Sequence, residues 1–144
     1  MNIDNVNKAI SVMERVKERG DRIDMHSWQD GATEIALTEQ DLHTCGTAAC
    51  FAGWVAVSPE FTQDGGKAKV TSGMPVLKNE EGVRAIALWL GMTYFEALGL
   101  CGLDNWRDIY GANMRYEDID ADAILTALYR LRDTGFIFPV QPDD

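Results

Sequence analysis

Apolar residues recur at helical spacing in the first part of the chain. Between residues 5 and 19 they fall every three or four positions, which predicts an amphipathic helix with one buried face. Asp4 or Asn5 is a suitable N-cap, and Gly20 is a suitable end. The positions expected to face inward are Val6, Ala9, Ile10, Met13 and Val16.

A second helix is predicted from Thr47, a good N-cap, to Val57, where Ser58-Pro59 stops it. Small or apolar residues occupy every side of this segment, so we expect it to be buried nearly all round. A glycine inside a helix costs roughly 0.5–1 kcal/mol relative to alanine. We therefore expect Gly53 to be there for close packing against another backbone.

Three more helices are expected further along the chain. Asn79 can cap a helix over 80–90, and Thr93 with Glu96 forms the pattern of a capping box for a helix over 94–100. Asp120 can cap a final helix over 121–133, which Gly135 ends. A short helical turn is also expected over 106–110.

The remaining pattern indicates little β-structure. Three short segments, 22–25, 67–71 and 136–140, can be extended, the last as an apolar tail that packs back on the core. The sequence therefore predicts one domain over 1–144, mainly α, with a compact helical body and a small two- or three-stranded β element. Residues 141–144 are expected to fray.

Charge changes this picture more than composition does. The chain has 23 acidic residues against 13 basic ones, a formal net charge of −10. Such a field repels nucleic-acid phosphates, so direct nucleic-acid binding is not expected. It favours solubility and, as a sharper interpretation, association with a basic surface of another protein.

The lack of a membrane-spanning run and of a secretory signal predicts a cytoplasmic protein. No apolar run approaches the ~20 residues that a membrane span needs, and the N-terminus lacks the basic and apolar regions of a secretory signal. Three cysteines is an odd count, which indicates reduced thiols rather than a disulfide framework.

The segment 43–54 carries the candidate chemistry. Cys45 would lie just before a helix start, where a thiol is activated, and His43 is two residues away. In papain-like hydrolases the histidine lies far downstream of the cysteine, whereas both histidines here lie at or before residue 43. Cys45 and His43 are thus candidate catalytic residues, and a thiol packed at a helix start is the favoured alternative.

A zinc site is a further alternative. His26, His43, Cys45 and Cys50 are the residue types that zinc prefers, but their spacing is poor for a zinc knuckle. The alternative is that Cys50 simply faces the core. No other cofactor is expected.

Acidic and aromatic residues cluster in the last third of the chain, where they could contact a basic protein. Trp106 and Tyr110 would be the aromatic anchors. The run over 117–122 is also typical of a solvated helix start, which is the competing interpretation. The candidate contact residues are Asp104, Trp106, Asp108, Tyr110, Glu117, Asp118, Asp120 and Asp122.

Several of these strings together resemble a known group. Asp24-Met25-x-x-Trp28, the string Cys45-Gly46-Thr47-x-x-Cys50-x-Ala52-Gly53-Trp54 and Leu90-Gly91-Met92-Thr93 are similar to those of a loose family of uncharacterised accessory proteins. Bacteriophages, plasmids and bacterial genomes encode that family. The resemblance implies a small accessory protein in a host bacterial cytoplasm, and it implies no catalytic residues.

Context and charge together predict an acidic inhibitor. The expected partner is a host protein with a basic surface, and a nucleic-acid-binding defence complex is the candidate target, in the manner of a DNA mimic or an anti-CRISPR protein. The alternatives are a thiol- or zinc-dependent enzyme and a structural module that dimerises through the small-residue helix or the apolar tail. Both monomer and homodimer are compatible with the sequence.

Overall fold

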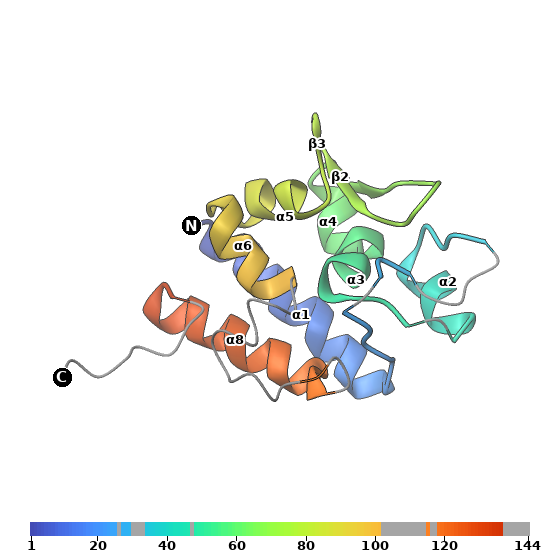
Figure 1. Cartoon of the computed structure of the whole chain (residues 1–144), viewed down its shortest axis with the longest axis horizontal. Coiled ribbons are helices and arrows are strands. Elements are labelled where there is room, and N and C mark those ends of the chain that lie inside the picture. The colour runs from blue at the N-terminus through green and yellow to red at the C-terminus, as the bar shows by residue number, and fades with distance from the viewer. Residues whose placement is uncertain (26, 30–33, 47, 102–114, 116–117, 137–144) are drawn as a thin grey trace.

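The computed structural model describes residues 1–136 apart from 26, 30–33, 47, 102–114 and 116–117. Helix α1 (Ile3–Arg19) crosses the molecule, and α8 (Ala121–Thr134) packs along it with the end of α8 beside the start of α1 (Figure 1). The predicted inward face of α1 is confirmed. Its N-cap is Asn2, because the Asn2 side chain accepts from the Asn5 amide at 3.1 Å, so the helix begins earlier than expected.

Three short helices follow α1. They are α2 (Glu39–Thr44), α3 (Phe51–Val57) and α4 (Pro59–Gln63). Arg15 of α1 ties two of them together, since its guanidinium binds Glu39 of α2 at 2.9 Å and also Glu60 of α4. All seven residues of α3 are buried, as the sequence predicted.

Helix α3 begins at Phe51, and the predicted start at Thr47 is wrong. Cys50 is extended, and Ala49 forms a parallel bridge with Ile23 and accepts the Asp24 amide at 3.0 Å. Cys50 is therefore the N-cap, and its sulfur accepts the Gly53 amide at 3.3 Å. A long-range backbone pairing has overridden the local capping preference of threonine.

Arg22, Ser27 and Trp28 contact the start of α3, and we call this set of contacts the clamp. The Cys50 amide donates to the Ser27 carbonyl at 3.0 Å, and Trp54 Nε1 donates to the Arg22 carbonyl at 3.1 Å. A Cβ built on Gly53 would lie 1.9 Å from the Trp28 carbonyl oxygen. The expected packing role of Gly53 is confirmed, and the neighbouring backbone is that of Trp28.

A small antiparallel sheet completes the mainly α fold, in the order β1 (Lys67–Ala68), β2 (Pro75–Leu77) and β3 (Glu80–Glu81). Its strands are not the predicted set, since only the 67–71 segment contributes. The 22–25 segment instead meets Ala49 in an isolated bridge. Phe136 is exposed and outside any strand, and 137–140 lie outside the described residues.

The predicted helix over 80–90 starts too early. Leu77 pairs with Glu80 across a two-residue turn in which Lys78 adopts a φ of 55°. Asn79 lies in this turn, a position that asparagine favours, rather than capping a helix. Helix α5 (Val83–Leu90) then begins after Gly82.

The later caps follow the sequence closely. Helix α6 (Tyr94–Cys101) opens with the predicted capping box, in which the Thr93 amide donates to Glu96 Oε1 at 3.1 Å and the Glu96 amide donates to Thr93 Oγ1 at 3.2 Å. Asp120 caps α8, and Gly135 ends it with a left-handed φ of 80°. The expected turn over 106–110 lies outside the described residues.

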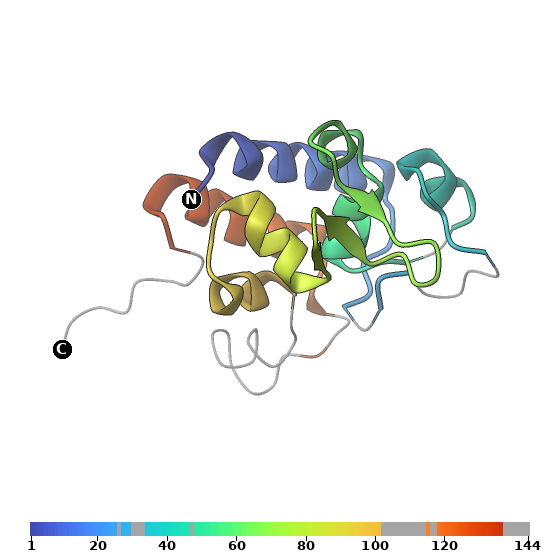
Figure 2. The same ribbon diagram turned by 90° about the horizontal axis from the view of Figure 1, so that it is seen from above.

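Helices α5 and α6 are joined by a sharp bend and lie beside the N-terminus (Figure 2). Within the described part of the chain, no single helix has both the length and the apolar character needed to cross a membrane. Among the described helices, α5 and α6 pass those criteria when taken together, but they are bent by 113° at their junction.

Replacing Gly53 with alanine tests the clamp. Replacing an unhindered helical glycine with alanine raises the free energy of unfolding by about 0.5–1 kcal/mol. Here the added Cβ would overpack the contact, so the free energy of unfolding should fall by about 3 kcal/mol. Chemical denaturation followed by circular dichroism measures it. Gly46→Ala is the control, since a Cβ there meets no atom within 4 Å and only its φ of +67° opposes the change. A stabilised Gly53→Ala variant would contradict the clamp.

Candidate functional site

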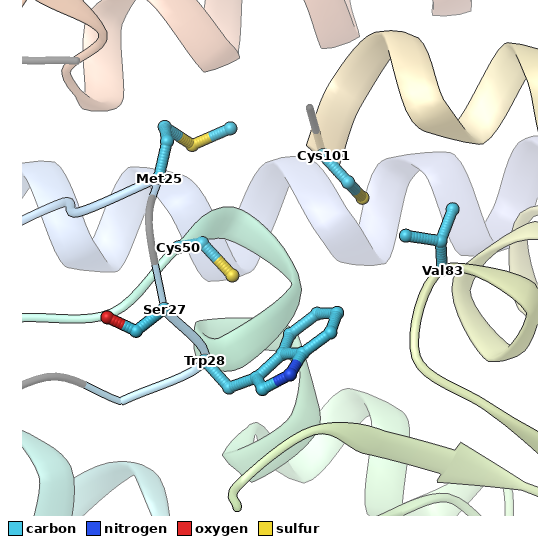
Figure 3. A pocket seen from close by; sticks show the side chains of 6 residues that line it. All are labelled: Met25, Ser27, Trp28, Cys50, Val83 and Cys101. Atoms are coloured by element: carbon cyan, nitrogen blue, oxygen red, sulfur yellow. The ribbon is translucent and has the colours of Figure 1, made fainter. Parts of the chain in front are cut away.

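The clamp brings Met25, Ser27 and Trp28 to the same pocket as Cys50, although Cys50 lies more than 20 positions further along the chain. The volume of the pocket is about 230 Å³, and its wall includes the N-cap of α3, the first residue of α5 and the last residue of α6 (Figure 3). The lining residues are Met25, Ser27, Trp28, Cys50, Val83 and Cys101. Gly82 borders the Trp28 ring, because a Cβ built on Gly82 would lie 3.6 Å from Trp28 Cζ2, an ordinary van der Waals contact.

The wall of the pocket is mainly apolar and rich in sulfur. Figure 3 shows the thiols of Cys50 and Cys101 directed toward the space beside the Trp28 ring, with Met25 on the Cys50 side and Val83 on the Cys101 side. Thiol, thioether and indole groups prefer an uncharged, polarisable guest. The pocket therefore suits an apolar side chain or a small apolar molecule.

Neither pocket thiol is poised as a nucleophile. Burial raises the pKa of Cys50 to about 11, against the smaller opposing effect of the backbone amide of Gly53. Burial also raises the pKa of Cys101 well above its ordinary value, and the nearby Cys50 adds to the shift. Both thiols stay protonated at neutral pH, and thiolate is the reactive form.

Cys45 has surroundings different from those expected. It is the C-cap of α2, so it lies at a helix end rather than just before a helix start. Its thiol is exposed and donates to the Leu42 carbonyl at 3.4 Å. The expected activation by a helix start is wrong, and nucleophilic catalysis by Cys45 stays a prediction.

His43 has a partner that the sequence did not indicate. Its Nδ1 lies 2.6 Å from Oδ1 of Asp21, and Asp21 Oδ2 accepts from Arg19 Nε at 2.7 Å. A carboxylate oxygen accepts, so in this contact Nδ1 is the donor and Nε2 is the ring nitrogen that does not contact Asp21. This is the orienting half of a general-base arrangement. The two residues are 22 positions apart, so no local signal in the sequence indicates this pair.

The predicted zinc ligands are not assembled among the described residues. His26 lies outside them, Cys50 is buried as the cap of α3, and His43 is bound to Asp21. Within the described part of the chain, no group of three or more histidine, cysteine, aspartate or glutamate side chains could hold a metal ion.

The predicted acidic contact set is described only in part. Asp104, Trp106, Asp108, Tyr110 and Glu117 lie outside the described residues. The other three acids have local partners. Asp118 accepts the Arg115 amide at 2.9 Å, Asp120 accepts the Ala123 amide at 2.9 Å, and Asp122 pairs with Lys17 at 2.6 Å. The helix-start interpretation of this run therefore has structural support.

Comparison with known proteins adds no assignment. The chain matches no protein-family profile, and no curated protein sequence or solved structure matches it significantly.

Thiol labelling tests the site. At neutral pH, iodoacetamide should modify Cys45 in the native protein and leave Cys50 and Cys101 unmodified, as read by peptide mass spectrometry. Raising the pH toward the Cys50 pKa of about 11 increases the thiolate, so Cys50 labelling should rise about tenfold per pH unit. Labelling in denaturant, where all three react, is the control. Equal rates in the native protein would contradict the buried pocket.

Proposed function

We propose that this protein is an acidic inhibitor that binds a basic surface on a host protein, with a nucleic-acid-binding defence complex as the target. The observation that carries the proposal is how the chain distributes its charge. At least seven of its 13 lysine and arginine side chains are in ion pairs with acids of the same chain. The pairs cancel many of the positive charges locally and leave an acidic surplus for contact with a partner.

Part of that surplus lies on the face formed by α1 and α8. A hollow of about 350 Å³ between these helices is lined by Glu14, Lys17, Glu18, Leu125 and Tyr129. Glu14 and Glu18 are exposed and one helical turn apart, so they present two carboxylates on the same side of α1. We name this surface the α1–α8 groove.

The groove suits a basic side chain of a partner. The Arg132 guanidinium already lies 5.0 Å from the Tyr129 ring centroid, so that ring face accepts a cation. A partner arginine could take the place of Arg132 at the Tyr129 ring while Glu14 and Glu18 bind its guanidinium. Asp122, one of the predicted contact residues, pairs with Lys17 at the same groove.

A thiol-dependent enzyme is the second candidate, and the Asp21–His43 pair is the observation that favours it. If His43 activates Cys45, then Asp21→Asn or His43→Gln should slow Cys45 alkylation strongly. If the thiol reacts only because it is exposed, both variants should leave its rate unchanged. The small-residue helix cannot serve as a dimer surface in this fold, because every residue of α3 is buried.

Charge reversal in the groove tests the inhibitor proposal. Tagged protein is used to capture partners from bacterial lysate at low and high salt, and the dissociation constant is then measured with the purified partner. Glu14→Lys with Glu18→Lys should weaken binding at least about tenfold, because close charge pairs couple by a few kcal/mol. Raising the salt concentration should weaken wild-type binding, because salt screens exposed charges.

Glu34→Lys with Glu80→Lys is the matched control, since it makes the same change in net charge on other surfaces. It should weaken binding much less than the groove variant. Binding that ignores salt, or that falls equally with both variants, would contradict recognition through the groove. A lysate that yields no basic partner would contradict the proposed function itself.

A further inference from the structure

Exposed apolar side chains gather at one corner of the molecule. Met1, Leu88, Tyr94 and Phe95 are 54%, 43%, 42% and 80% exposed, and they are four of the eight large apolar residues exposed in the described part of the chain. Met1 is at the N-terminus, Leu88 is near the end of α5 and Tyr94 and Phe95 open α6; the N-terminus lies beside the junction of α5 and α6 (Figures 1 and 2). We name these four residues the α5–α6 corner. Apolar residues that are exposed singly are ordinary, whereas a contiguous group marks an interaction site.

The N-terminus is fixed to the end of α5. The Asn2 amide donates to the Leu90 carbonyl at 2.8 Å. A Cβ built on Gly91 would lie 3.3 Å from the Met1 Cα, so Met1 lies directly against this helix end. The Gly91 amide in turn donates to the Leu88 carbonyl at 3.3 Å, which places Leu88 on the adjacent turn.

The two aromatic rings continue the same surface. Arg84 and Leu88 are both exposed and one turn apart on α5, and the Arg84 guanidinium lies 5.3 Å from the Tyr94 ring centroid. The Tyr94 and Phe95 rings meet edge to face with centroids 6.0 Å apart. Helix α6 buries Ala97, Gly99 and Leu100 and leaves its first turn uncovered.

Charges of both signs border the corner. Arg84 is exposed on α5, and Glu96 is exposed on the first turn of α6. A basic partner would meet Arg84 here, so this surface is a poor match for the partner proposed above. A second copy of the chain offers Glu96 to Arg84 and Arg84 to Glu96, which is the self-complementarity that a two-fold interface requires.

We propose that the α5–α6 corner is the interface of a two-fold homodimer, in which Phe95 packs against the corner of the other copy. Aromatic residues at the centre of such a contact contribute most of its stability. The response to salt separates this contact from the inhibitor surface. Two chains of charge −10 repel each other, so salt should strengthen the dimer, whereas it should weaken binding to a basic partner.

Sedimentation equilibrium over a wide concentration range, at low and high salt, tests the dimer. The wild-type protein should dimerise more tightly at high salt. Phe95→Asp should raise the dimer dissociation constant at least about tenfold, the loss expected for a central aromatic residue. Val70→Asp is the matched control, because Val70 is 70% exposed in the β1–β2 connection and should not change the constant.

Leu88→Asp gives a second, independent disruption, and thermal melting checks that each variant is folded. Arg84→Glu should weaken the dimer, and adding Glu96→Arg should restore it if the two residues pair across the two-fold axis. A wild-type protein that stays monomeric at every concentration would overturn the proposal. The proposal would also be overturned if the wild-type protein bound zwitterionic vesicles and a monomeric Phe95→Asp variant did not, since the corner would then be a membrane contact.

Discussion

The contact between Gly53 and the Trp28 carbonyl is the constraint on which much of this structure depends. It allows the 22–28 segment to lie against the start of α3, where the Ile23–Ala49 bridge and the Cys50 amide hold it. This places Met25 and Trp28 in the wall of the pocket. It also fixes the chain immediately after Asp21, which binds His43. One missing Cβ therefore supports both the pocket and the acid–histidine pair.

Local signals in the sequence were enough for most of the helices. The capping box at Thr93 and Glu96, the Asp120 cap and the inward face of α1 rest on neighbouring residues, and the structure has them all. One error occurs where a distant segment decides the local structure, and another where a local signal fits two structures. Thr47 could not reveal that Ala49 pairs with Ile23, and Asn79 suits a turn as well as it suits a cap.

The site was predictable only in part for the same reason. The chemistry of the 43–54 segment is legible, but the surroundings of Cys45 depend on where α2 ends, and the partner of His43 lies 22 residues away. The net charge of −10 could be predicted from the sequence without knowing the fold, whereas the surroundings of Cys45 and His43 could not. The structure adds that the acidic groove and the apolar corner are different surfaces, so one partner on each is geometrically compatible.

The pairing of α1 with α8 has a consequence for synthesis of the chain. The buried face of α1 is covered largely by α8, which begins at Ala121, whereas α1 ends at Arg19. At roughly 5–20 residues per second, about 100 residues separate the two helices by ~5–20 s of translation. During that interval the buried face of α1 has no α8 to pack against it. The buried face of α1 is therefore covered only after α8 has been made, and a ribosome that stalls between the two helices leaves a nascent chain with exposed apolar surface.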